Sequence, residues 1–459
     1  MRRIGIQIGA VSFVDEGTER VLDILQERAA VNTLFLAVFS YGRGIAGRQI
    51  PGQPLPDHGK QEYDLDFHGG NYATVHPQYY QDTVLRPEDT RAPDHGKLDI
   101  LAAVLPAAKK RGLRTFLWTI DKAPPASVPN IEKLQERQLD GRNSTELCFN
   151  NPHHRNFLLG LMEDYTRSYE IDGIMWASER RGPLINTLDS GDAGRAACFC
   201  GYCERKAQRL GIRFDRVRAG YTELGKALQA SRAGRRPADG HYVTLWRTLL
   251  RYPEIVAWET FWNDSLRETY AAIYGKVKSI RPDLPVGWHI AHSMSFSPIY
   301  RAEQEVAELA KYSDFLKMVM YHNCAGERLA RYVDNQTSGA FADFPKSQFL
   351  EFEYRVMNYQ ERSYEQIPHT GLSADYVYRE TKRCLDGAAG TKVQIWPGID
   401  IDIPTASNHS KSTPQGTKAA VMAAFRAGAT GVVLSRKYSE IKLANLRGAG
   451  EAIRELGGR

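Results

Sequence analysis

The sequence of 459 residues predicts a single (β/α)8 barrel, and three observations favour this fold. Eight short apolar segments alternate with longer amphipathic segments from one end of the chain to the other. Their hydrophobicity is continuous, which is typical of parallel strands that are buried on both faces. The connections that follow the predicted strands are long, as they are where a barrel gathers its functional loops at one face. A doubly wound open sheet is the competing fold, because periodicity alone does not separate the two.

The eight predicted strands are five to seven residues long, and all contain β-branched or aromatic residues. They comprise residues 4–9, 33–39, 114–120, 173–177, 286–290, 316–321, 392–397 and 431–435.

The helices between these strands carry start and stop signals. A helix is expected after Asn151, because an asparagine N-cap followed by Pro152 at the first helical position is a typical beginning. Apolar side chains then recur every three or four residues as far as Tyr169, which gives the helix one core-facing stripe. Three further helices are predicted at 253–280, 418–428 and 444–456.

The long connections after the strands are expected to build the functional face. They comprise 41–98, 121–150 and 180–243, whereas the connections from helices back to strands are only a few residues long. Loops of such length usually have a function. The sequence has no internal repeat and no low-complexity linker, so 1–459 is predicted to be one catalytic barrel with loop insertions.

Composition excludes several classes of protein. Hydrophobic residues make up 42% and charged residues 25%, as in ordinary globular chains. The net charge of +6 is mild and the longest basic run is three residues, so we expect no nucleic-acid partner. There is no apolar run long enough for a membrane span. The first residues lack the apolar region of a secretion signal, which favours the cytoplasm. A homo-oligomer is possible, and no organic cofactor is expected.

Two acidic residues close predicted strands and are the candidate catalytic pair. Glu179 follows the fourth strand, where partial burial can raise a carboxyl pKa into the range of a general acid. Asp400 follows the seventh strand and the Pro397-Gly398 pair. Two carboxylates on opposite walls of one barrel opening could cleave a glycosidic bond, with Asp400 as nucleophile or general base. Alternatively, Glu179 is only ion-paired with a neighbouring arginine, and Asp400 only caps the next element.

Other strand ends carry groups that suit a sugar, whose hydroxyls need donors and acceptors. The expected substrate-binding residues are Tyr41, Arg43, His68, Asp121, His289, His292, His322 and Arg436. The histidines among them offer a second interpretation, in which His289, His292 and His322 bind a metal ion in a metal-dependent sugar isomerase or lyase. A sugar-binding barrel without catalytic activity is the third hypothesis.

The cysteines form the most specific local motif. Cys198, Cys200 and Cys203 have C-x-C-x2-C spacing, which suits thiolate ligation of a tetrahedral metal ion. Cys148 lies in the preceding long loop and is the expected fourth ligand. We therefore predict a structural zinc ion that ties two long loops together. The alternative is a set of free or partly oxidised thiols.

These motifs resemble those of clan A glycoside hydrolases. The layout is similar to that of family 42 β-galactosidases and of bacterial glycosyl hydrolase-like barrels of unassigned activity, through MWASER, CFCGYC and PGIDID. The resemblance implies a glycosidase that acts on a carbohydrate, with Glu179 as acid/base and the four cysteines as a zinc site. Two residues depart from the family pattern, since Ser178 replaces the usual asparagine and Asp400 the usual glutamate. Glu351 and Glu353 are alternative nucleophiles, but helical spacing around them favours Asp400.

Overall fold

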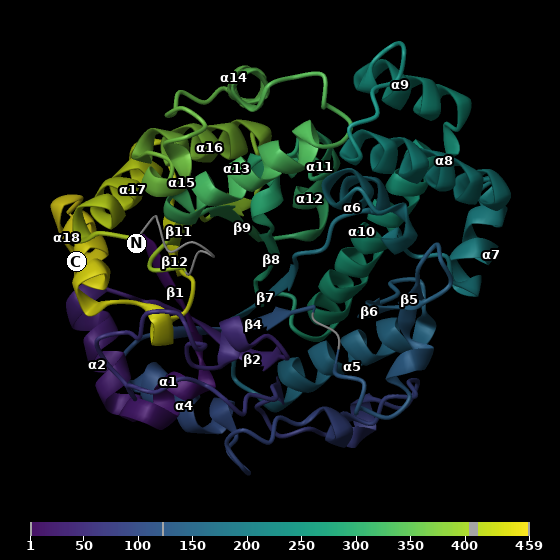
Figure 1. The fold of residues 1–459 in the computed structure, drawn as a ribbon. Helices are drawn as coiled ribbons and strands as arrows, with labels where there is room; N and C mark the ends of the chain where they lie inside the picture. Colours follow the sequence, from purple (N-terminus) through teal and green to yellow (C-terminus); the bar gives the residue numbers. More distant parts are fainter. Residues whose placement is uncertain (1, 122–123, 404–411, 458–459) are drawn as a thin grey trace.

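A computed structural model, which describes residues 2–121, 124–403 and 412–457, has the predicted closed barrel (Figure 1). Eight parallel strands follow one another around it, and the pairing of the first with the second completes the closure. The barrel strands are β1 (Arg3–Gly9), β2 (Thr33–Ser40), β4 (Arg114–Ile120), β7 (Gly173–Ser178), β8 (Val286–Ile290), β9 (Phe315–Met320), β11 (Gly398–Asp400) and β12 (Gly431–Ser435). The predicted (β/α)8 fold is confirmed, and the open sheet is excluded.

The seventh strand differs from its prediction. It forms two short pieces, β10 (Gln394–Ile395) and β11, and both pair with β9. Pro397 lies between them and has no N–H group for a sheet ladder, which explains the interruption. Asp400 is consequently the last residue of a strand and does not lie in a loop beyond it.

Helices surround the barrel, as Figure 1 shows. The helices that follow the eight strands or cover the sheet are α2 (Thr18–Ala29), α4 (Ile100–Lys110), α5 (Pro152–Ser168), α10 (Glu254–Ile280), α13 (His322–Thr337), α16 (Ala374–Gly387), α17 (Pro414–Arg426) and α18 (Leu443–Glu455). The other helices outside the long connections are α1 (Ala10–Glu16), α3 (Arg43–Ala46), α11 (Pro298–Glu303), α12 (Val306–Leu309), α14 (Lys346–Met357) and α15 (Ile367–Thr370). The predicted start of α5 is confirmed, because the Asn151 side chain accepts a hydrogen bond from the N–H of His153.

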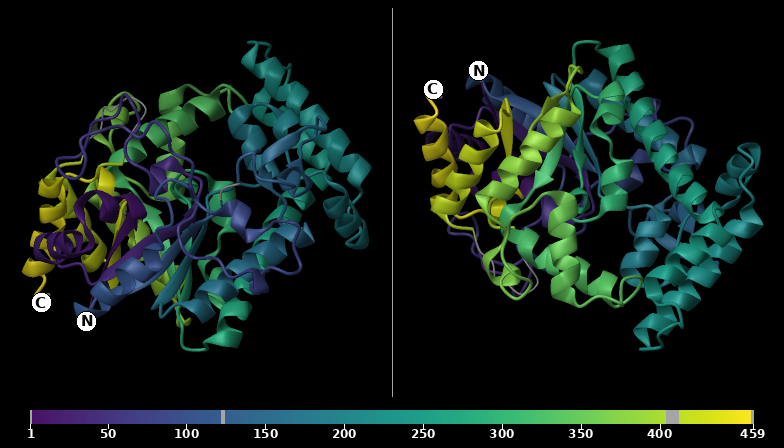
Figure 2. Two further views of the ribbon diagram at one scale, coloured as in Figure 1. Left: turned by 90° about the horizontal axis from the view of Figure 1, so that it is seen from below. Right: turned by 90° about the horizontal axis from the view of Figure 1, so that it is seen from above.

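The three long connections contain further secondary structure. The first includes β3 (Gly70–Asn71), which pairs with the end of β2. The second forms a hairpin of β5 (Gln135–Arg137) and β6 (Asn143–Leu147). The third forms α6 (Pro183–Ser190), α7 (Gly201–Arg209), α8 (Phe214–Arg232) and α9 (His241–Arg251), at the side of the molecule far from α18 (Figure 2).

Glycines on three strands make room for phenylalanine rings inside the barrel. A Cβ atom on Gly173 would lie 2.3 Å from the ring of Phe116, and one on Gly5 would lie 2.4 Å from the ring of Phe35. A Cβ atom on Gly287 would likewise overlap the ring of the neighbouring Phe315. Because the interior is filled in this way, the barrel has a packed core beneath its functional face.

A second hydrophobic core lies outside the barrel. It joins α6, α7, α8 and α10 to the end of the β5–β6 hairpin, and it contains Trp258, Phe199 and Tyr221 as its largest buried side chains. The third long connection is therefore a packed layer of helices rather than an extended loop. Within the described ranges, every helix is too short or too polar to cross a membrane.

The glycine–phenylalanine packing predicts a large effect for one methyl group. Gly173→Ala should lower the free energy of unfolding by about 1–3 kcal/mol, because the added carbon overlaps the Phe116 ring. Gly275→Ala in α10 is the control, since a Cβ there meets no atom within 4 Å. That change should stabilise the helix by about 0.5–1 kcal/mol. Urea unfolding of both variants checks this, and equal effects of the two substitutions would contradict it.

Candidate active site

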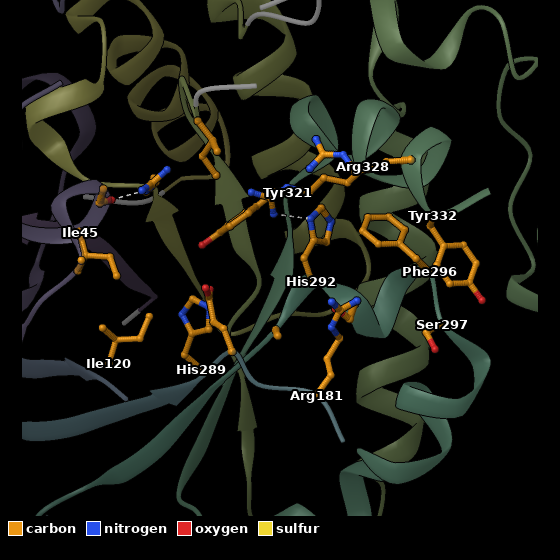
Figure 3. Close-up of a pocket in the computed structure, with 18 of the residues that line it drawn as sticks. Ile45, Ile120, Arg181, His289, His292, Phe296, Ser297, Tyr321, Arg328 and Tyr332 are labelled. Atoms are coloured by element: carbon orange, nitrogen blue, oxygen red, sulfur yellow. Dashed lines mark hydrogen bonds and ion pairs between the residues drawn. The ribbon is translucent and has the colours of Figure 1, made fainter. Parts of the chain in front are cut away.

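A cavity of about 520 Å³ opens at the carboxyl ends of the barrel strands (Figure 3). Its walls come from strands or strand ends on opposite sides of the barrel and from the helices after β8 and β9. The polar and aromatic residues that line it are Gln7, Trp118, Glu179, Arg181, Asp189, His289, His292, Ser293, Phe296, Ser297, Tyr321, Arg328, Arg331, Tyr332, Asn335 and Arg436. Of the predicted site residues, Glu179, His289, His292 and Arg436 are thus brought together.

Glu179 lies directly after β7 and presents its carboxylate to the cavity. Its side chain is 42% exposed, and its Oε1 atom lies 3.0 Å from Nε2 of the buried His289. Burial and the nearby Lys317 lower the pKa of His289 to about 4, so this imidazole is neutral at physiological pH. Nδ1 of His289 lies 3.3 Å from the Lys317 amine and accepts from it, so the ring proton is on Nε2, which faces Glu179 Oε1 without the alignment of a hydrogen bond.

Lys317 is a residue of this network that sequence reasoning missed. It lies on β9 with no exposed surface, and its Nζ atom contacts His289, the Tyr321 hydroxyl and Oε1 of Gln7. Burial lowers its pKa well below the usual value. Room for the amine comes from Gly398, where a Cβ would lie 2.8 Å from Nζ. The available signal was a lysine inside the otherwise apolar strand FLKMVM.

Both ring nitrogens of His292 contact polar atoms of the protein. Its Nδ1 accepts from Arg328 at 3.0 Å, and its Nε2 lies 3.1 Å from the hydroxyl of Tyr376. Burial and Arg328 lower its pKa well below 6.5, so it is a neutral histidine with both ring nitrogens in use. His322 is buried outside the cavity, and burial lowers its pKa to about 4. Among the described residues, the three histidines do not form a group with metal-binding geometry.

Asp400 is buried beneath the cavity surface and does not line it. Its Oδ2 accepts from the N–H of Cys324 at 2.8 Å, and its Oδ1 accepts from the N–H of Ile403 at 3.1 Å. Burial raises its pKa to about 6, although both hydrogen bonds favour the ionised form. In this conformation the carboxylate fixes the beginning of α13 to the end of β11.

The remaining predicted sugar-binding residues lie away from the cavity. Tyr41 donates a long hydrogen bond to the carbonyl of Thr90, at 3.4 Å. Arg43 donates to the carbonyl of Leu65 at 3.5 Å, although its neighbours Gly42 and Gly44 do line the cavity. His68 is exposed at the surface, and Asp121 lies below the loop that follows Glu179.

Several cavity residues gave no signal in the sequence because they lie on helices rather than at strand ends. Arg328 and Tyr332 belong to α13, and Asp189 belongs to α6. Arg181 was considered only as an ion-pair partner of Glu179, whereas its guanidinium contacts Asp189.

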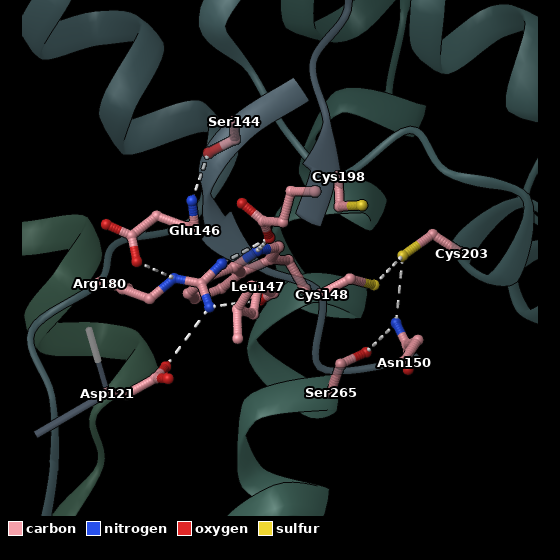
Figure 4. Close-up of polar contacts among 12 residues, drawn as sticks. Asp121, Ser144, Glu146, Leu147, Cys148, Asn150, Arg180, Cys198, Cys203 and Ser265 are labelled. Carbon is pink, nitrogen blue, oxygen red and sulfur yellow. Dashed lines mark hydrogen bonds and ion pairs between the residues drawn. The ribbon is translucent and has the colours of Figure 1, made fainter. Parts of the chain in front are cut away.

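Arg180, the residue after Glu179, anchors the loop that follows β7 (Figure 4). It is only 7% exposed, and its guanidinium forms ion pairs with Glu136 at 2.6 Å and with Asp121 at 3.4 Å. It also donates to the carbonyl of Leu147 at 2.7 Å, and it lies 4.3 Å above the ring of Phe149. These contacts attach the Glu179 loop to the β5–β6 hairpin.

The hairpin leads directly into the cysteine cluster. The Sγ atoms of Cys148, Cys198, Cys200 and Cys203 all lie within 4.8 Å of one another. Cys148 Sγ is 3.6 Å from Cys200 Sγ and 3.5 Å from Cys203 Sγ, close to the edge of about 3.8 Å that a tetrahedral site with Zn–S bonds of about 2.3 Å requires.

Backbone and amide groups around the cluster donate to its sulfur atoms. The N–H of Arg137 lies 3.4 Å from Cys198 Sγ, and Nδ2 of Asn150 lies 3.3 Å from Cys203 Sγ. Such donors stabilise thiolates, so the donor set fits a metal ion such as zinc. The predicted grouping of the four cysteines is confirmed.

Comparison with known proteins identifies solved structures that have a similar fold. No family model and no curated protein matches the chain. Solved structures do match: α-L-fucosidase isoenzyme 2 from Paenibacillus thiaminolyticus has a TM-score of 0.54 at 12% identity, over 100% of this chain and 49% of that one. The PgaB (BpsB) glycoside hydrolase domain from Bordetella bronchiseptica has a TM-score of 0.52 at 12% identity, over 100% and 99%. A GH42 β-galactosidase from G. stearothermophilus has a TM-score of 0.51 at 10% identity, over 99% and 57%.

These similarities agree with the resemblance seen in the short sequence motifs. The chain shares the barrel fold of glycoside hydrolases, and it spans about half the length of the fucosidase.

The Arg180 contacts predict that this side chain contributes strongly to stability. Arg180→Gln should lower the free energy of unfolding by about 3–5 kcal/mol, because Glu136 and Asp121 are left buried without their counter-charge. Arg142→Gln is the matched control, since its ion pair with Asp140 is solvent-exposed and should leave the melting temperature unchanged. A small effect of Arg180→Gln, similar to that of the control, would contradict the anchoring role.

Proposed function

We propose that the protein hydrolyses a glycosidic bond, with Glu179 as the general acid/base. The observation that carries this proposal is the position of Glu179 on the cavity surface after the fourth barrel strand, held at 3.0 Å from a neutral His289. Strand ends at this face are where barrel enzymes place their catalytic groups. The fold that the chain shares with glycoside hydrolases supports the same reaction class.

In this mechanism, the Glu179 carboxylic acid transfers a proton to the leaving glycosidic oxygen. In a retaining mechanism, the resulting carboxylate then removes a proton from the water that hydrolyses the covalent glycosyl-enzyme intermediate, whereas in an inverting mechanism a second carboxylate takes that proton. The neutral ring of His289 lies beside the carboxylate, with its Nε2 atom 3.0 Å from Oε1, while Lys317 holds the imidazole from the other side. A sugar ring would contact Trp118, Phe296 or Tyr332, whose apolar faces suit its C–H groups.

The sequence-based prediction gave the role of second carboxylate to Asp400. For Asp400 to act as nucleophile, it must give up its hydrogen bonds to the N–H groups of Cys324 and Ile403 and move into the cavity. The other acidic residue of the cavity wall, Asp189, is bound by Arg181 and by Nε2 of Gln336. The two roles of Asp400, nucleophile or cap, have different consequences for its variants.

The histidine-centred isomerase or lyase is disfavoured by the contacts of its proposed ligands. His292 uses both ring nitrogens, and His289 faces Glu179 and the Lys317 amine. A sugar-binding barrel without activity remains the second candidate, and turnover distinguishes it from the enzyme.

We further propose that Cys148, Cys198, Cys200 and Cys203 hold a structural zinc ion. Four sulfur donors select zinc over hard cations such as magnesium. The cluster lies in the second core and not in the cavity, so the ion would stabilise the fold and would take no part in the cleavage step.

The first prediction concerns Glu179. Glu179→Gln should reduce turnover of aryl glycosides by at least about 10²–10⁴-fold, because an amide cannot transfer the proton. Glutamine has the same size and shape as glutamate, so folding and sugar binding should persist. Glu223→Gln on α8 is the matched control, since that side chain is exposed to a similar extent at 45%. Equal turnover by Glu179→Gln and wild type would remove Glu179 from the mechanism. If the wild-type protein turns over no member of a glycoside panel, the sugar-binding barrel is favoured instead.

The second prediction concerns Asp400. Asp400→Asn should lower the free energy of unfolding by about 1–3 kcal/mol, since the amide NH2 group cannot accept from the N–H of Cys324 or Ile403. If Asp400 acts as a cap, the folded variant should retain turnover. A loss as large as that of Glu179→Gln in a variant of unchanged stability would instead establish Asp400 as the second carboxylate.

The third prediction concerns the metal. Elemental analysis of the purified protein should find one zinc ion per chain, and removal of zinc by a chelator should lower the melting temperature. Cys200→Ser should lose the ion, whereas Cys384→Ala, which changes a buried thiol outside the cluster, should keep it. Protein without zinc, together with an unchanged melting temperature of Cys200→Ser, would refute the site.

A further inference from the structure

The cavity wall carries an excess of positive charge. Its lining includes Arg181, Arg328, Arg331 and Arg436, while the acidic residues of the lining are Glu179 and Asp189. Three of these guanidinium groups come from separate elements, namely the loop after β7, helix α13 and the residue after β12. Figure 3 shows Arg181 and Arg328 on either side of His292.

The arginines differ in how their charges are balanced. Arg181 forms an ion pair with Asp189, and Arg331 forms one with Glu327 at 3.0 Å. Arg436 donates to the carbonyl of Gly44 and lies 3.7 Å from a carboxylate oxygen of Glu440.

Arg328 is the exception among them. It is partly buried, and its hydrogen bond is made to Nδ1 of His292. No carboxylate of the described residues lies within the ion-pair distance of 4.0 Å from its guanidinium. His292 is neutral, because its Nε2–H is directed to Tyr376 and burial opposes a second proton. The histidine therefore orients Arg328 without neutralising its charge.

The nearest negative charges, on Glu179 and Asp400, act on this guanidinium only from beyond ion-pair distance. A guanidinium that is partly removed from water and has no paired counter-charge is unfavourable unless a ligand supplies the anion. Arginine is also the side chain best suited to carboxylates and sulfates, because its planar group can form two parallel hydrogen bonds. A neutral sugar offers hydroxyl groups, which do not require this charge. Phe296 and Tyr332 flank the same part of the cavity and could contact the sugar ring (Figure 3).

We propose that the substrate is a glycoside whose sugar carries an acidic group, and that Arg328 forms the ion pair with that group. This inference rests on the proposed glycosidase function and specifies its substrate class. A uronic acid carboxylate and a sulfate ester share the required chemistry. Arg328 is thus assigned as a specificity-determining residue, separate from the proton transfer by Glu179.

Binding to the Glu179→Gln protein tests the proposal without requiring turnover. The probes are p-nitrophenyl glucuronides and galacturonides, the corresponding 6-sulfated glycosides, their neutral parents and inorganic sulfate, each measured by calorimetry. We expect at least one acidic glycoside to bind at least tenfold more tightly than its neutral parent, with affinity falling as salt is added. Preference for the uronides would identify a carboxylate as the anion, and preference for the sulfated sugars would identify a sulfate ester.

Substitution of Arg328 assigns the effect to this residue. In the same background, Arg328→Gln should weaken binding of the preferred acidic glycoside at least tenfold and leave binding of the neutral parent within twofold. Arg328→Lys should recover part of the loss. Arg167→Gln on α5, whose side chain is paired with Glu163 one turn away and lies outside the cavity, is the matched control and should change neither affinity more than twofold.

The proposal is overturned if acidic and neutral glycosides bind equally, or if Arg328→Gln weakens both to the same extent. It is also overturned if neither the acidic probes nor inorganic sulfate bind. If acidic glycosides bind through Arg328 but the wild-type protein cleaves none of them, the inference about the anion stands and the hydrolase proposal fails.

Discussion

The position of the candidate catalytic carboxylate depends on the burial of one arginine. Glu179 itself is half exposed and would be mobile if only its own contacts held it. The next residue, Arg180, is buried among Glu136, Asp121 and an aromatic ring, so the backbone of the loop cannot shift without exposing that charge network. The same arginine donates a hydrogen bond to the carbonyl of Leu147, which directly precedes Cys148 of the cysteine cluster. Strand end, hairpin and cysteine cluster are thus connected through one side chain.

The fold could be predicted because its strands are apolar throughout, which has a direct physical cause in burial on both faces. The exception is instructive. Residues 392–397 were predicted as one strand, but Pro397 cannot complete the ladder, and pairing resumes at Gly398. The hydrophobicity of the segment does not indicate that strand pairing is interrupted at Pro397. The resulting shift places Asp400 inside the sheet, where its oxygen atoms meet backbone N–H groups of α13 and of the following loop.

The site was predictable only where its residues come from strand ends. Glu179, His289, His292 and Arg436 were found because the carboxyl ends of parallel strands meet at one face. Tyr41 and Arg43 follow the same rule in sequence, and His68 was predicted from the long loop after them, yet all three side chains turn to nearby carbonyl or carboxylate groups of the long first connection.

Residues that reach the cavity from helices depend on how those helices pack, and no local pattern indicates this. Arg328 lies on α13 and Asp189 on α6, each some distance from a strand end. Lys317 is a different case, since its burial is favourable only beside Tyr321, His289 and Gln7 from three strands or strand ends. That grouping exists only once the barrel closes, so a reader of the sequence alone sees an isolated charge.

The second core has a consequence for local motion. Proteins open in cooperative units that coincide with separately packed regions, and the helices α6 to α9 with the cysteine cluster form such a region beside the barrel. Arg180 joins the loop of Glu179 both to the hairpin that leads into that region and to Asp121 at the end of β4. The loop is therefore tied to the barrel as well as to the insertion. Opening of α7 and α8 alone would expose amide groups of the insertion to exchange with solvent, while those of the loop and of the strands beneath it remain protected.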